Sequence, residues 1–306
     1  MLHAGVWQHP RYLRSTVLCL GLASLLIAPP SGGAGQVAAI AAPAADSVAS
    51  KDGVNIVFTA AGEGQTALVF IHGWACNRSF WKAQVEHFSP KYKVVALDLA
   101  GHGESAGGRE AYTIEAFGDD VAAVVEKLNL NRVILIGHSM GGQVSIAAAR
   151  DLGDKVIGIV GADTLQDFTE TRTPDQVERA LKPFKDDFKG TTRAFATAVF
   201  GDKAAPALVQ SVCSQMCSIQ PAVGLSALRS EALYNVKSEL VGFKLPLRVI
   251  NSDKYPTNVA GNKEIYRNFA MVPMPGVGHF VMLEDPARFN QLLEGVIAEL
   301  VAKRPM

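Results

Sequence analysis

The sequence lacks a net charge of either sign, because 29 lysine and arginine residues are matched by 29 aspartate and glutamate residues. Proteins that bind nucleic acid neutralise phosphates with an excess of basic residues. A formal net charge of 0 therefore gives no support to a nucleic-acid partner. Charge is also scarce relative to apolar residues, at 19% against 48%, and this balance is typical of a globular chain and not of a disordered one.

Cysteine is also scarce, with 4 residues in the chain. Outside the N-terminal segment there remain Cys76, Cys213 and Cys217, and none forms a Cys-x-x-Cys pair. An odd number without that spacing argues against a zinc site or a disulfide framework. If Cys213 and Cys217 lie on one helix, their geometry is poor for a disulfide, so we expect free thiols.

The apolar run near the N-terminus, Val17 to Ala28, is too short for a comfortable membrane span. It follows Arg11 and Arg14 and precedes small residues with Ala-x-Ala-like sites. This order is typical of a secretory signal peptide, predicted here at 1–41. We expect a secreted or periplasmic mature protein with no membrane span. An uncleaved anchor and a disordered N-terminus are the alternatives.

Strand-like apolar runs alternate with helical patterns through most of the remaining chain. We expect buried strands at 67–71, 93–97, 133–136, 156–162, 245–250 and 270–274, and an antiparallel edge strand at 53–61. Strands that alternate with helices form parallel sheets whose two faces are both covered. The predicted fold class is therefore α/β, with a mostly parallel central sheet and helices on both faces.

One long stretch interrupts this alternation. Between 164 and 242 there is no strand-like run, and amphipathic segments follow one another, beginning with Thr173-Pro174 as a helix start. We interpret 164–242 as a helical cap inserted over the sheet. The core is then predicted to comprise a first part, 42–163, and a second part, 243–306.

The stretch around Ser139 carries the strongest local motif. Gly137-His138-Ser139-Met140-Gly141 follows a buried strand and precedes an alanine-rich helix, expected at about 141–151. In this context Gly-x-Ser-x-Gly is the pattern of a nucleophile elbow, a sharp, strained turn that exposes the serine hydroxyl. Side chains at positions 137 and 141 would collide with the strand and the helix that the turn brings together, so both are glycine.

Four stretches, in their order and spacing, resemble the α/β-hydrolase fold family with a helical cap. They are His-Gly-Trp at 72–74, Asp-Leu-Ala-Gly-His-Gly-Glu-Ser at 98–105, Gly-His-Ser-Met-Gly-Gly at 137–142 and Gly-His-Phe at 278–280. The resemblance extends from Gly53 to Arg304. It implies that carbonyl substrates, mostly esters, react at a Ser–His–acid triad that needs no metal or organic cofactor.

The residue chemistry assigns roles within this pattern. Ser139 needs a base to become a nucleophile, and His279 lies in a glycine-containing loop after the last strand, from which it reaches Ser139. His72, His102 and His138 are expected to hold loops instead. The backbone N–H groups of Met140 and Trp74 are expected to bind the oxyanion. The Trp74 ring either floors the acyl pocket or is a core aromatic.

The acid of the triad has two candidates. Relatives usually carry Gly-x-x-Asp after the penultimate strand, but here the aspartate position is Tyr255, and the nearest carboxylate, Asp253, comes two residues earlier. Asp253 still follows the carboxyl end of a parallel strand, on the active edge of the sheet, and we favour it. Asp163 is the rival because it ends the strand after the nucleophile helix; otherwise it holds the entry loop of the cap.

These observations predict a serine hydrolase that cleaves a small or medium carboxylic ester through Ser139, His279 and Asp253, with an acyl-enzyme intermediate. Two alternatives stay open. The same triad serves carbon–carbon bond hydrolysis and cofactor-free peroxidation. A protein that keeps the triad but turns over slowly is instead a small-molecule binding protein.

Overall fold

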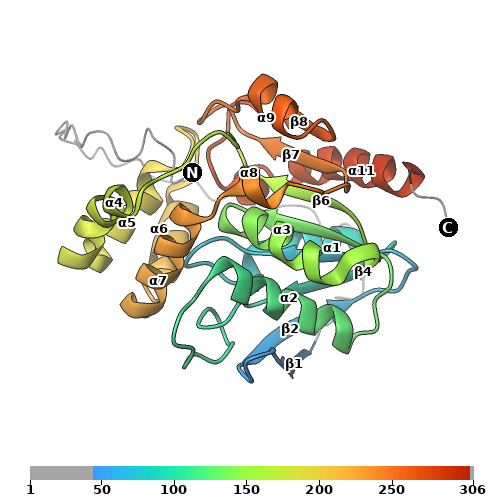
Figure 1. Ribbon diagram of the computed structural model, residues 1–306, viewed down its shortest axis with the longest axis horizontal. Helices are drawn as coiled ribbons and strands as arrows, with labels where there is room; N and C mark the ends of the chain where they lie inside the picture. Colours follow the sequence, from blue (N-terminus) through green and yellow to red (C-terminus); the bar gives the residue numbers. More distant parts are fainter. Residues whose placement is uncertain (1–43, 304–306) are drawn as a thin grey trace, which may run out of the picture.

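Short apolar segments form an eight-stranded central sheet in the computed structural model, which describes residues 44–303 (Figure 1). The predicted signal peptide, 1–41, lies outside the described residues. The strand order is β1-β2-β4-β3-β5-β6-β7-β8. The strands are β1 (Ala45–Ala49), β2 (Asn55–Ala61), β3 (Ala67–Ile71), β4 (Lys93–Leu97), β5 (Val133–His138), β6 (Val156–Ala162), β7 (Leu247–Asn251) and β8 (Phe269–Pro273).

The predicted α/β architecture with a mostly parallel sheet is confirmed. Strands β4, β3, β5, β6, β7 and β8 pair in parallel, and β2 is antiparallel to both of its neighbours. Every residue of β3, β5, β6 and β7 is buried. β3 and β6, and β5 up to Gly137, read as continuous apolar runs because helices cover both faces of a parallel sheet, whereas β7 also buries Arg248 and Asn251.

The prediction that 53–61 forms an edge strand is wrong in one respect. β2 is antiparallel as expected, but β1 pairs along its outer side, from Ala45 opposite Thr59 to Ala49 opposite Asn55. β1 has the sequence Ala-Asp-Ser-Val-Ala, and one β-branched residue among small and polar ones gives no recognisable strand pattern. Its pairing partner, and not its own propensity, makes it a strand.

Helices pack against both faces of the sheet (Figure 1). α2 (Ile114–Lys127) and α3 (Met140–Leu152) lie together on one face, where a Cβ added to Gly118 would come within 2.9 Å of the Ala147 Cβ. On the other face, Phe70 of β3 packs against Trp81, and Trp81 packs against Phe289 of α11 (Pro286–Lys303), next to α1 (Lys82–Phe88). The shorter elements are η1 (Arg78–Trp81), η2 (Gly153–Lys155), α9 (Val259–Ile265) and α10 (Val281–Glu284).

Five helices and no strand lie between β6 and β7. They are α4 (Pro174–Asp186), α5 (Phe188–Ala198), α6 (Pro206–Met216), α7 (Pro221–Leu233) and α8 (Val236–Glu239). α4 to α7, which we call the cap, gather to one side of the sheet (Figure 1). Thr173 and Gln176 form a capping box at the start of α4, whose first residue is Pro174. The exact domain boundaries stay a prediction.

Backbone-to-side-chain hydrogen bonds attach the cap to the core. The Tyr112 N–H donates to Ser226 Oγ and the Ile114 N–H donates to Ser230 Oγ, both at 2.9 Å, so the start of α2 is tied to α7. The three described cysteines, Cys76, Cys213 and Cys217, are buried free thiols. None of the helices within 44–303 is long and apolar enough to cross a membrane.

Candidate functional site

Ser139 stands at the tight turn between β5 and α3, as the motif predicts. Its backbone has φ 52° and ψ −122°, a left-handed conformation that non-glycine residues seldom adopt. A Cβ on Gly137 would lie 2.1 Å from the Gly141 carbonyl oxygen, and a Cβ on Gly141 would lie 2.5 Å from the Ile71 carbonyl oxygen. The strained elbow is therefore held between two glycines that no other residue can replace without moving the backbone.

His279 and Asp163 meet at the same end of the sheet. His279 Nδ1 lies 2.7 Å from Asp163 Oδ2, and the two side chains are 7% and 0% exposed. The His279 ring centroid is 4.6 Å from that of His138, the residue before Ser139. Because a carboxylate can only accept, Nδ1 carries the proton and Nε2 is the basic nitrogen. This is the arrangement of a general base whose ring a buried acid orients.

Asp163 is itself fixed by its neighbours. It follows β6 with φ 46°, and its Oδ1 accepts the Ser252 N–H at 2.7 Å. The residue before Ser252, Asn251, binds the residue after Asp163, Thr164. Asn251 Nδ2 donates to the Thr164 carbonyl, and Asn251 Oδ1 accepts the Thr164 N–H. The end of β7 thus binds the Asp163 carboxylate through the Ser252 N–H and the backbone of the next residue, Thr164, through the Asn251 amide.

The prediction that Asp253 orients His279 is wrong. Asp253 is exposed, and its Oδ1 accepts the Gly276 N–H at 2.8 Å. The chain passes Asp163 at Ser252, one residue earlier, and the Asp253 side chain then lies on the outer side of the loop. Tyr255, at the usual acid position, lies close enough to Asp163 that burial and this carboxylate raise the pKa of its hydroxyl to about 12.

The two expected oxyanion donors also lie at this end of the sheet. Met140 is the first residue of α3, where N–H groups have no acceptor within the helix. The loop that carries Trp74 presses on the elbow, since a Cβ on Gly73 would lie 3.0 Å from the Ser139 Cβ. The role of the two N–H groups stays a prediction, which this placement makes geometrically reasonable.

The Trp74 side chain joins the core to the cap. It is 4% exposed, and its Nε1–H donates to the Gly224 carbonyl of α7 at 2.9 Å. Its ring makes edge contacts with Phe184, Phe188 and Phe195 at centroid distances of 5.6, 6.1 and 5.9 Å. The ring is thus a packed aromatic of the core–cap interface.

Three other buried histidines hold loops around the site. His72 Nδ1 donates to the Gly73 carbonyl at 2.8 Å, and its Nε2 accepts the Leu99 N–H at 3.0 Å. His138 Nε2 donates to the His279 carbonyl at 3.0 Å. Burial lowers the pKa of His72 to about 4. Burial and the nearby His72 ring lower the pKa of His102 to about 3. These rings are neutral spacers near neutral pH.

We expect these neutral histidines to make the protein acid-sensitive. The pKa of His72 is near 6.5 when unfolded and about 4 when folded, so between these values the unfolded state binds more protons. Stability then falls with falling pH, by up to about 1.4 kcal/mol per pH unit for one such histidine. Urea unfolding between pH 7 and pH 4.5 measures this slope. His72→Gln should reduce the slope, and the exposed control His87→Gln should not. Equal slopes for all three proteins would contradict the assignment.

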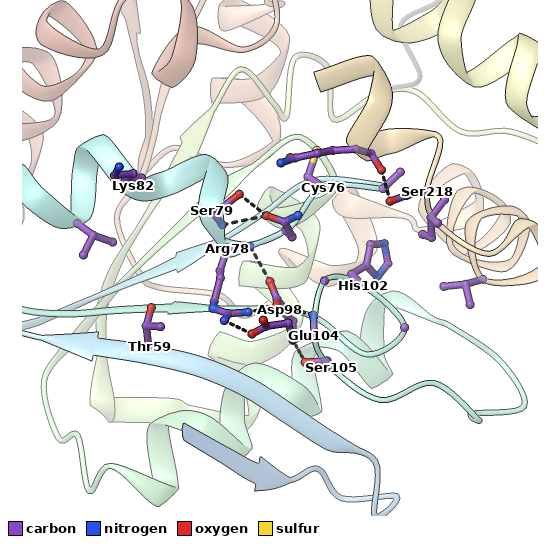
Figure 2. Close-up of a pocket in the computed structure, with 18 of the residues that line it drawn as sticks. Thr59, Cys76, Arg78, Ser79, Lys82, Asp98, His102, Glu104, Ser105 and Ser218 are labelled. Atoms are coloured by element: carbon purple, nitrogen blue, oxygen red, sulfur yellow. Dashed lines mark hydrogen bonds and ion pairs between the residues drawn. The ribbon is translucent and has the colours of Figure 1, made fainter. Parts of the chain in front are cut away.

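A large pocket is lined by residues other than those of this site (Figure 2). Its volume is about 910 Å³, and its walls come from β2, α1, the loops after β3 and β4 and the turn between α6 and α7. Ser139 and His279 do not line it. Within it Arg78 binds the carboxylates of Asp98 and Glu104, and Asp98 accepts the Arg78 and Glu104 N–H groups at 2.7 and 2.8 Å. These ion pairs therefore connect the loop after β3 to the loop after β4.

No set of three histidine, cysteine, aspartate or glutamate side chains within 44–303 is grouped as a metal site. Ser139, His279 and Asp163 are the candidate reactive side chains that the structure brings to this end of the sheet.

Comparison with known proteins gives the following similarities. A model of the alpha/beta hydrolase family matches residues 68–292. Karrikin insensitive 2 receptor IA of Petunia hybrida is 26% identical over 74% of the chain and 88% of its own length. The corresponding values for 3-oxoadipate enol-lactonase 2 of Acinetobacter baylyi are 25%, 76% and 88%. A thermophilic esterase from Thermogutta terrifontis has a similar structure, with a TM-score of 0.73 and 23% identity over 84% of this chain and 99% of that one.

Proposed function

The chain belongs to the alpha/beta hydrolase family, and on that premise we propose that it cleaves small or medium carboxylic esters through an acyl-enzyme. The observation that carries the proposal is the buried His279–Asp163 pair beside the Ser139 elbow. A relative named enol-lactonase favours an ester, since a lactone is a cyclic ester. We also propose that the mature protein is secreted or periplasmic, on the basis of the signal peptide predicted at 1–41.

The geometry supports the following course. Ser139 Oγ attacks the ester carbonyl while His279 Nε2 takes the hydroxyl proton, and Asp163 stabilises the imidazolium through Nδ1–H. The Met140 and Trp74 N–H groups bind the oxyanion, a contribution of roughly 3–4 kcal/mol per donor. His279 returns the proton to the departing alcohol. Water, deprotonated by His279, then attacks the acyl-enzyme; His279 returns that proton to Ser139 Oγ as the acyl–oxygen bond breaks and the acid is released.

A second candidate is a small-molecule receptor that turns over slowly. It is favoured by one observation, that a relative of similar length is named a receptor. The two candidates differ in rate. A panel of aryl and alkyl esters, lactones and diketones, each followed over many turnovers, separates ester hydrolysis from carbon–carbon hydrolysis and from binding with slow cleavage.

Fluorophosphonate labelling tests the nucleophile directly. We expect one probe per chain, on the peptide that contains Ser139, because only a serine activated by a neighbouring base reacts rapidly with this reagent. Mass spectrometry after digestion locates the adduct. A folded protein that stays unlabelled, or that is labelled at another residue, would argue against a serine hydrolase.

A further inference from the structure

Glu284 binds the backbone on both sides of His279. It is the last residue of α10, the single helical turn that follows the His279 loop. Glu284 Oε2 accepts the Gly278 N–H at 2.9 Å, and Oε1 accepts the Phe280 N–H at 3.3 Å. One carboxylate therefore clasps the residue before His279 and the residue after it.

The same carboxylate reaches the cap. Glu284 Oε2 also accepts the Gly201 N–H, at 3.0 Å, just beyond the C-terminal end of α5. The His279 N–H donates to the Val199 carbonyl at 2.8 Å, and Lys254 Nζ donates to the Phe200 carbonyl at 3.0 Å. Each residue of the segment Val199–Gly201 therefore makes a hydrogen bond to the core. The partners lie in the His279 loop, in the loop after β7 and at the end of α10.

These two segments pack so closely that neither glycine has room for a side chain. A Cβ on Gly278 would lie 2.2 Å from the Gly201 nitrogen, and a Cβ on Gly201 would lie 2.9 Å from Glu284 Oε2. The rings of Phe200 and Phe280 stack at 4.9 Å between centroids. Both glycines permit the close approach that brings two backbone N–H groups to one oxygen.

A carboxylate that accepts three N–H groups makes charge-assisted hydrogen bonds, which are stronger than neutral ones. Asp163 holds the His279 ring, and His138 holds its carbonyl, but both contacts come from the core. Glu284 is the side chain that sets the backbone of the base loop relative to the cap. A base misplaced by about 1 Å loses on the order of 10²-fold in rate.

We propose that Glu284 is a positioning residue for His279, fixing the base loop against the cap segment Val199–Gly201. This inference rests on the proposed hydrolase function for its kinetic consequences. Its structural content, that Glu284 keeps the His279–Asp163 contact in register, stands apart from any substrate.

The kinetic test compares Glu284→Ala and Glu284→Gln with Asp285→Ala. Asp285 is the matched control because it is the neighbouring carboxylate and caps α11 through the Arg288 N–H without touching the base loop. We expect kcat to fall by about 10²-fold in Glu284→Ala, with KM near the wild-type value. Glu284→Gln should fall less, since its amide retains one acceptor oxygen. Asp285→Ala should keep the wild-type kcat, although the loss of the α11 cap should lower its melting temperature.

A second readout separates positioning from a loss of folded protein. His279 must protonate an alkoxide leaving group, whereas nitrophenolate leaves without that help. The Glu284 variants should therefore lose more activity on an alkyl ester than on a nitrophenyl ester with the same acyl group. A loss of folded protein would reduce both rates equally. Equal losses, or wild-type kcat in both variants, would overturn the inference.

The third readout needs no substrate. The Nδ1–H proton of His279 should resonate far downfield in the wild-type NMR spectrum and be shifted or lost in Glu284→Gln. If the wild-type protein cleaves no ester and takes no fluorophosphonate, the proposed function fails, and this resonance still decides whether Glu284 positions His279. An unchanged resonance in Glu284→Gln would contradict the inference.

Discussion

Asp163→Asn is expected to lower kcat for ester hydrolysis by about 10⁴-fold, as the loss of the acid does in the serine-protease template. Asparagine at 163 presents its amide to Nδ1, favours the other imidazole tautomer and puts the proton on Nε2. The base then cannot accept the Ser139 proton. The measurement is steady-state kinetics on an ester that the wild-type protein turns over.

The matched control is Asp253→Asn, which removes the same charge from the neighbouring loop. Its carboxylate touches only the exposed Gly276 N–H among the described residues, so we expect nearly wild-type turnover. Loss of activity in Asp253→Asn together with normal activity in Asp163→Asn would restore the assignment based on sequence and refute the one based on structure.

Ser139→Ala is expected to lower kcat by about 10⁶-fold, the order found when the nucleophile of a triad is removed. The oxyanion donors and the substrate contacts remain, so a small rate above that of water should persist. Circular dichroism should be unchanged, because alanine has the same Cβ as serine at this φ. Active-site titration must exclude traces of wild-type enzyme at this level of activity.

Ser145→Ala is a suitable comparison for this variant. It removes a buried hydroxyl from the same helix, where Ser145 Oγ donates to the Gly141 carbonyl at 2.7 Å. We expect it to retain turnover. If Ser139→Ala were as active as Ser145→Ala, the hydrolysis would not proceed through Ser139.

The fold could be predicted from the sequence because its signals are local. The buried runs that became β3, β5 and β6 are continuous and apolar, and Thr173-Pro174 supplies an N-cap and a proline at the first helical position of α4. β1 could not be predicted in this way. Its five residues become a strand only because β2 offers an edge of unpaired N–H and C=O groups.

The Ser139 elbow and the loop position of His279 likewise follow from the sequence by itself. A turn with φ 52° depends on the residues next to it, and Gly137 and Gly141 are visible in the chain. The partner of His279 is a different kind of property. Asp163 lies 116 residues before His279, and Glu284 binds Gly201 across 83 residues.

Only the tertiary structure decided those two pairings. Asp253 and Asp163 both follow parallel strands whose carboxyl ends lie at the same end of the sheet, and strand position alone cannot distinguish them. The choice depends on where the chain passes after β7. Ser252 places its backbone N–H on Asp163 and leaves Asp253 outside. A carboxylate orients a histidine only within hydrogen-bond distance, and that distance is set by packing between segments that the sequence does not place together.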